Sequence, residues 1–174
     1  CGAGHSIGVD MREIRIEGDV AYVPLTQGYE AVIDAADRHL VAGYNWTVLV
    51  GPRTVYACRT GPRPKQHKVF MHRLLMGEPE GFQIDHIDSD GLNNRRNNLR
   101  TATKSQNQCN QRLNARNKSG FKGVSWHVPS AKWQSHIMLH GKSRNLGHFG
   151  CPTAAHFAYV KASRALHGEF GRIG

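Results

Sequence analysis

Residues 84–110, IDHIDSDGLNNRRNNLRTATKSQNQCN, decide the fold of this chain. An apolar run ends at Asp85 and His86, and a loop rich in Asp, Gly and Asn follows. Asn98 then precedes a short strand-like segment, LRTAT, and Asn107 lies in a polar segment that is typical of a helix. The order of these segments predicts a strand, a loop, a second strand and a helix.

The polar positions of this stretch form a long motif without gaps. It resembles the motif of the HNH endonucleases with a ββα-metal fold, in particular the homing endonucleases of phages and introns. That motif runs D-H-x-D-x-x-x-x-N-N-x-x-x-N-L, followed by Thr and a final Asn. The matching positions are Asp85, His86, Asp88, Asn93, Asn94, Asn98, Leu99, Thr103 and Asn107. The resemblance implies an enzyme that hydrolyses a phosphodiester bond of DNA and leaves a 5′ phosphate.

The resemblance also implies roles for four of these side chains. Asp85 and Asn107 would hold one divalent metal ion, Mg²⁺ or Mn²⁺, because both ions prefer oxygen ligands. His86 would be the general base that takes a proton from the attacking water, since the ordinary pKa of imidazole suits this task near neutral pH. Asn98 would hold the loop so that His86 keeps its orientation. Many HNH enzymes carry His in place of Asn107, so the preferred metal stays open.

Three other interpretations of the motif stay open at this point. Asp88 and Asp90 could belong to a calcium loop, although the Glu that closes such a loop is missing. The chain could be a sequence-specific DNA-binding protein that keeps the nuclease fold only as a scaffold, and the joint presence of all four site residues argues against this. An RNA nuclease is disfavoured, because the sequence offers no aromatic platform on which bases would stack.

Arginines beside the motif are candidates for contacts with DNA. His72 and Arg73 resemble a His-Arg pair that precedes the motif in many relatives, and Arg73 could contact the cleaved strand. A solvated helix face explains this pair equally well. Arg95 and Arg96 lie in the loop itself, where cationic side chains can hold the phosphate backbone.

Residues 121–174 predict three short strands followed by a helix, which begins at Pro152 and ends before Gly168. From residue 119 to about 170, the runs SGFKGVSW, KW, LGHF and AA resemble the Apetala-two or ethylene-response-factor DNA-binding domain. In that family the sheet enters the major groove of DNA. Alternation along the middle strand turns one set of side chains towards the helix, namely Trp133, Ser135, Ile137 and Leu139.

The opposite face of this sheet is where the resemblance places the contacts with DNA. Lysine and arginine would hold phosphates, and Gln134 or Arg144 could read base edges. A solvated sheet face is the alternative. The candidate contacts are Lys122, Ser125, His127, Lys132, Gln134, His136, Met138 and Arg144.

The distribution of charge favours double-stranded DNA as the partner. The 174 residues contain 23 Lys and Arg against 13 Asp and Glu, which gives a net charge of +10. Residues 1–80 hold nine basic and nine acidic side chains, residues 81–120 seven and three, and residues 121–174 seven and one. A neutral half joined to a basic half predicts that the second half binds the polyanion.

Together, these patterns predict an α+β protein with two domains. Residues 1–11 are expected to be a leader or remnant, and residues 112–120 a linker. The nuclease domain would span residues 12–111, with a small antiparallel sheet leading into a ββα-metal core at 81–111. A three-stranded sheet packed on one helix would form the DNA-binding domain, residues 121–174.

The cysteine and hydropathy patterns limit which cofactors and which cellular compartment we expect for this protein. The four cysteines, at positions 1, 58, 109 and 151, form no C-x-x-C pair, so we expect no structural zinc. No apolar run approaches the roughly 20 residues that cross a bilayer. We therefore expect no membrane partner and an intracellular, cytoplasmic protein in a bacterial or phage-infected host. A monomer is favoured and would nick one strand, whereas a dimer, the alternative, would cut both.

Overall fold

The computed structural model describes residues 12–51, 54–64, 66–114 and 116–174, so the predicted leader lies outside the described residues. Two compact units are present. The first extends to Glu80 and also includes Asp90–Arg100, and the second comprises Gly81–Ser89 and Thr101–Gly174. The motif at 84–110 therefore contributes residues to both units, and the predicted linker at 112–120 lies within the second.

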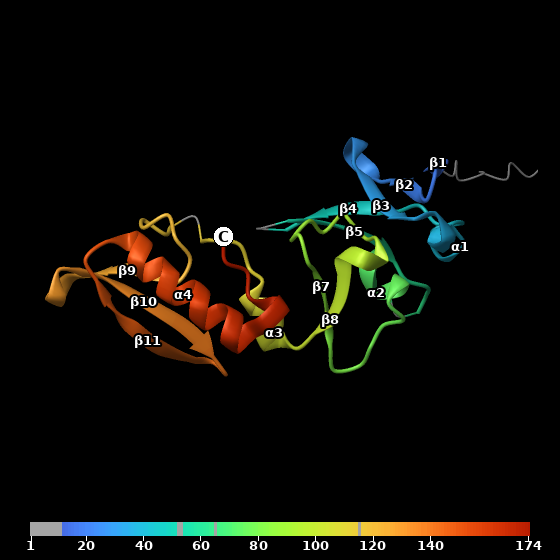
Figure 1. Ribbon diagram of the computed structural model, residues 1–174. Coiled ribbons are helices and arrows are strands. Elements are labelled where there is room, and N and C mark those ends of the chain that lie inside the picture. Colours follow the sequence, from blue (N-terminus) through green and yellow to red (C-terminus); the bar gives the residue numbers. More distant parts are fainter. Residues whose placement is uncertain (1–11, 52–53, 65, 115) are drawn as a thin grey trace, which may run out of the picture. The chain divides into compact units, whose positions relative to one another are not determined.

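Two small antiparallel sheets build the first unit, where the sequence predicts one (Figure 1). In β2 and β3 the buried side chains alternate with less buried ones, as in sheets with one face on a core. The strands are β1 (Arg15–Glu17), β2 (Val20–Pro24) and β3 (Glu30–Asp34) in one sheet, and β4 (Thr47–Val50), β5 (Val55–Thr60) and β6 (Lys68–Phe70) in the other.

Two short helices complete the first unit, α1 (Arg38–Val41) and α2 (Met71–Leu75). Trp46 follows α1 and is the largest fully buried side chain of the described residues. Its indole N–H donates to the carbonyl of Val41 at 3.0 Å, so its polar atom is satisfied inside the core.

The predicted order of strand, loop, strand and helix is confirmed. Strand β7 (Gln83–His86) and strand β8 (Leu99–Ala102) form a two-stranded sheet, and α3 (Lys104–Cys109) follows directly. A capping box starts α3: the Thr103 hydroxyl accepts from the backbone N–H of Gln106, and the Gln106 side chain accepts from the backbone N–H of Thr103. This reciprocal pair satisfies two of the free donors at the helix N-terminus.

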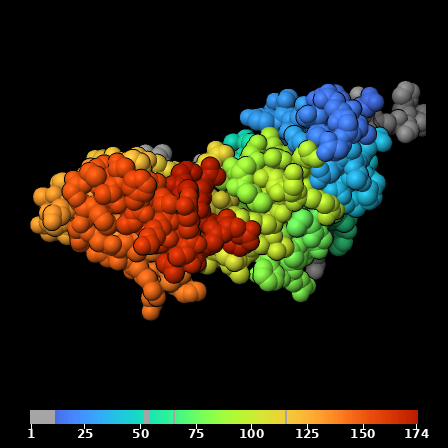
Figure 2. Space-filling model, in the orientation of Figure 1, coloured from blue at the N-terminus to red at the C-terminus, as the bar shows by residue number. Residues whose placement is uncertain are grey.

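The predicted three-stranded sheet packed on one helix is also confirmed, and with it the α+β class. Helix α4 (Pro152–His167) lies across the sheet (Figure 1) and, with the residues after it, forms much of the surface coloured orange to red in Figure 2. Ser135 and Ile137 are buried beneath it, as the alternation predicts. The strands are β9 (Val124–His127), β10 (Lys132–Leu139) and β11 (Lys142–Phe149), in the spatial order β11-β10-β9.

Candidate active site

Asp85 and His86 are the last two residues of β7, and both are buried, with 5% and 6% of their surface exposed. Successive side chains of a strand point to opposite faces of the sheet. The carboxylate and the imidazole therefore leave the strand on different sides. One strand of the second unit thus supplies two chemically different groups, one on each of its faces.

Helix α3 packs against the face of β7 that carries Asp85. The amide of Asn107 donates to the side-chain carbonyl of Gln83 at 2.8 Å. One helical turn later, the amide nitrogen of Asn110 lies 3.1 Å from each carboxylate oxygen of Asp85. Gln83 and Asp85 share a strand face, and residues three apart share a helix face. Asp85 and Asn107 thus belong to the same strand–helix contact.

The donor set at this contact suits a hard divalent cation. Asp85 supplies carboxylate oxygens, and the amide nitrogen of Asn107 is used by Gln83, so its carbonyl oxygen is the atom available to a cation. Mg²⁺ and Mn²⁺ accept such oxygens and keep several waters, so two protein ligands suffice. Among the described residues, no group of three or more His, Cys, Asp or Glu side chains is arranged to hold a metal.

Asn110 is not among the predicted site residues, although it is the most heavily bonded amide of this contact. Besides the Asp85 carboxylate, its nitrogen lies 2.9 Å from the carbonyl oxygen of His86. It is 6% exposed and caps the C-terminal end of α3. The signal available in the sequence was its spacing, three residues after Asn107 on one helix face.

Asn98 holds the motif's loop within the first unit. Its amide donates to the carbonyl of Asn93 at 2.8 Å, and its backbone N–H donates to the carbonyl of Arg95. The loop is in turn docked on β3, because Val32 donates to Leu92 at 2.8 Å and accepts from Asn94 at 2.7 Å. These contacts support the loop-holding role predicted for Asn98.

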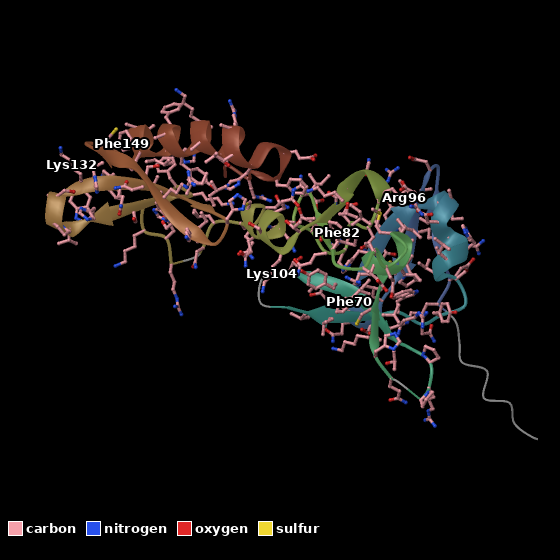
Figure 3. All side chains as sticks on the ribbon, turned by 90° about the horizontal axis from the view of Figure 1, so that it is seen from below. Phe70, Phe82, Arg96, Lys104, Lys132 and Phe149 are labelled. Atoms are coloured by element: carbon pink, nitrogen blue, oxygen red, sulfur yellow. The ribbon has the colours of Figure 1, made fainter. Side chains whose placement is uncertain are left out.

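Arg95 and Arg96 form ion pairs inside the first unit. Arg95 contacts Asp34 and Asp19, and Arg96 donates two parallel hydrogen bonds of 2.8 Å to Asp37 (Arg96 is labelled in Figure 3). Burial would raise the pKa of Asp34, but the backbone N–H of Arg96 and the guanidinium of Arg95 lower it on balance. Both arginines therefore fasten the loop to the unit; their predicted contact with DNA stays a prediction.

His72 is not on a solvated helix face, which corrects one of the two interpretations of the His-Arg pair. It is buried in α2, with its ring centre 5.5 Å from that of Phe70 and 5.7 Å from that of Tyr56. Arg73, the next residue, is half-buried.

Comparison with known proteins assigns the segment that carries this site to a family. The family model described as HNH endonuclease matches residues 69–109, the segment from β6 to the end of α3. Protein 3.8 of Escherichia phage T7 is 35% identical over 95 residues, which cover 55% of this chain and 78% of that protein. Residues 69–109 therefore belong to the HNH endonuclease family, and the chain is related to this phage protein.

A second relative of this HNH protein is more distant. The uncharacterized HNH endonuclease L560 of Acanthamoeba polyphaga mimivirus is 28% identical over 105 residues. The alignment covers 60% of this chain and 54% of that relative, so the chain spans about half of its length. No solved structure matches the chain significantly. Within the described part of the chain, no helix is long and apolar enough to cross a membrane.

The free face of the C-terminal sheet carries most of the predicted DNA contacts of the HNH protein. By register, Ser125 lies opposite Gln134, and His127 opposite Lys132, which Figure 3 labels. Directly opposite residues share a face. The face also holds His136 and Met138 from the predicted set, and His148 and Asn145, which were not predicted.

Arg144 lies differently from the prediction. The register shifts between Ser135 and His136, and Arg144 then pairs with Ile137, whose side chain is buried under α4. Arg144 is therefore on the helix side of edge strand β11, where it is exposed. Its predicted contact with DNA would have to be made at the edge of the sheet.

Lys122 is engaged inside the second unit rather than on the free face. Its ammonium donates to the carbonyls of Cys109 and Gln111, each at 2.7 Å, and so closes the C-terminal end of α3. Burial, with a smaller contribution from Arg172, lowers the pKa of Lys122 to about 8. Its predicted phosphate contact stays a prediction.

The lowered pKa of Lys122 has a measurable consequence. We expect its side-chain Cε signal in an NMR titration to shift with a midpoint near 8, well below the ordinary value of 10.5. Between these two values the unfolded chain binds more protons than the folded one, so the free energy of unfolding rises with pH there, relative to a Lys122→Met variant. A midpoint near 10.5 would contradict the burial of this ammonium.

Proposed function

We propose that this chain is a metal-dependent DNA endonuclease of the homing type, which hydrolyses one phosphodiester bond and leaves a 5′ phosphate. A monomer with one site would nick one strand. The observation that carries the proposal is the pairing of Asp85 and His86 on buried strand β7, with Asn107 on the helix packed against it. The phage relative supports a role in a bacterial or phage-infected host.

Each residue of the site has a defined task in this proposal. His86 takes the proton of the attacking water, and Asn98 keeps the loop in place so that the imidazole is correctly presented. Asp85 and Asn107 would hold the divalent ion, Mg²⁺ or Mn²⁺. When bound, such an ion stabilises the negative charge that develops at the phosphate and on the leaving 3′ oxygen.

We further propose that residues 121–174 direct the enzyme to its target, as an Apetala-two type domain would. This segment has seven basic side chains and one acidic one. On its free face, Lys132 can hold a phosphate and Gln134 can pair with adenine in the major groove. His127, His136 and Ser125 add hydrogen-bonding groups to the same face.

Relaxation of supercoiled plasmid by the full chain, with Mg²⁺ or Mn²⁺ and with EDTA as the blank, tests the proposed activity. We expect relaxed circles in the presence of metal and none with EDTA. Asp85→Asn should lower the rate by about 10²-fold or more, because a bound cation contributes several kcal/mol to phosphoryl chemistry. Gln108→Ala, which changes an exposed side chain of α3, is the matched control and should cleave at the unchanged rate.

The product distribution separates the remaining alternatives. Linear plasmid formed without a relaxed intermediate would indicate a dimer that cuts both strands. If neither random nor phage-derived DNA is cut, either the substrates lack the target or the chain is a non-catalytic DNA-binding protein, and tight binding of duplex DNA would favour the second.

A further inference from the structure

Asn110 connects the two proposed catalytic groups through one amide. Its nitrogen lies 3.1 Å from both oxygens of Asp85 and 2.9 Å from the carbonyl oxygen of His86. A side-chain amide carries two N–H groups, so one can serve the carboxylate and the other the main chain of His86. The Asp85 side chain and the His86 backbone are thereby fixed relative to each other.

The position of Asn110 is itself fixed from both sides. Its backbone N–H donates to the carbonyls of Gln106 and Asn107 at the end of α3. The carbonyls immediately before and after it, those of Cys109 and Gln111, both accept from Lys122. The segment around Asn110 is therefore held by helix α3 and by Lys122, which shortly precedes the C-terminal sheet.

We infer that Asn110 is a positioning residue of the nuclease. It orients the Asp85 carboxylate towards the cation and fixes the position of this carboxylate relative to the backbone of His86. The inference rests on the proposed function. Its amide lies symmetrically between the two carboxylate oxygens, and one N–H uses only part of the acceptor capacity of a carboxylate, which has about four lone-pair sites. Hydrogen bonds from neutral donors to buried carboxylates are stronger than those between neutral groups. Partners of metal ligands typically change metal affinity or activity by about 10- to 100-fold when removed.

The test compares Asn110→Ala with Gln108→Ala in the full chain. For Asn110→Ala we expect Mn²⁺ affinity, measured by calorimetry in the absence of DNA, to fall by about 10-fold or more. The kcat for nicking should fall by a similar factor, while KM for DNA stays within about twofold. Gln108→Ala should change none of these. A loss of thermal stability alone, with unchanged Mn²⁺ affinity and kcat at a temperature where the variant is folded, would overturn the inference.

An NMR measurement keeps the inference testable if Asn110→Ala does not fold. The side-chain amide signals of Asn110 in the metal-free protein should shift in Asp85→Asn, which removes the charge from the acceptor, and should not shift in Gln108→Ala. Unchanged signals in both variants would show that the Asn110 amide does not contact the Asp85 carboxylate, and would overturn the inference.

The outcomes distinguish this inference from the proposed function. If the wild-type chain binds Mn²⁺ and Asn110→Ala weakens that binding, but no DNA is cut, the positioning role stands and the nuclease proposal fails. If the wild-type chain neither binds Mn²⁺ nor cuts DNA, both fail.

Discussion

Replacing His86 with alanine is expected to reduce plasmid nicking by about 10²- to 10⁴-fold, the range that a general base contributes. The imidazole is the group proposed to take the proton of the attacking water, and alanine cannot accept it. Because Asp85 and Asn107 are unchanged, Mn²⁺ affinity measured by calorimetry should stay within about twofold of the wild-type value. Affinity for duplex DNA should also be retained.

His39→Ala is the matched control for this prediction. His39 is exposed in α1, and a nitrogen of its ring lies 2.8 Å from the backbone carbonyl oxygen of Ala36. Its nicking rate should equal that of the wild type. Full activity in His86→Ala would assign proton transfer to another group. Loss of Mn²⁺ binding in the same variant would mean that His86 contributes to the metal site as well.

Gly123→Ala is expected to destabilise the second unit by about 3 kcal/mol, which lowers the melting temperature by on the order of 10 °C. Two effects add. Gly123 has φ of +72°, a left-handed conformation that costs L-residues about 1–2 kcal/mol. An added Cβ would also lie 2.1 Å from Cδ2 of Tyr159, a buried ring of α4, and overpacking typically costs about 1–3 kcal/mol.

Gly120→Ala separates these two effects. Gly120 has nearly the same backbone conformation, φ of +74°, but a Cβ there meets nothing within 4 Å. We expect a loss of about 1 kcal/mol in thermal unfolding of this variant, from the backbone alone. Equal losses in the two variants would show that Tyr159 moves aside without cost and that the close approach of Gly123 to the Tyr159 ring does not constrain the unit.

Local sequence signals predict the motif region well. Asp85 and His86 end a strand, Thr103 and Gln106 form a capping box, and Asn107 follows on the helix. In the C-terminal segment, Pro152 and Gly168 mark the helix ends. These features are decided by neighbouring residues, through strand periodicity and helix capping, so they can be predicted without knowledge of the tertiary structure.

Strand pairing in the first unit is harder to predict from local sequence signals. The sequence predicts one small antiparallel sheet ahead of the motif. In the structure β4 pairs with β5 and not with the preceding strands, so two sheets form. Each strand is too short for its own pattern to select a partner, and the choice depends on packing around Trp46 and its neighbours in the core.

The roles of the charged residues depend most on the tertiary structure. Arg95 and Arg96 look available for DNA in the sequence, but their partners Asp34 and Asp37 lie about 60 residues earlier in the chain. Lys122 likewise finds its two carbonyls at the end of α3. An isolated cation and a paired one have the same sequence signature, because only folding brings the acceptor within hydrogen-bond distance.

The sequence by itself therefore determined the nuclease motif, its order of strand, loop, strand and helix, and the basic sheet-and-helix segment that follows. These follow from side-chain chemistry and from conformational preferences that act over a few residues. Only the tertiary structure brought Asn110 to the Asp85 carboxylate, 25 residues away, and moved Arg144 to the helix side of its sheet. Both depend on how β7 packs on α3 and how β11 shifts its register, which are properties of contacts between elements.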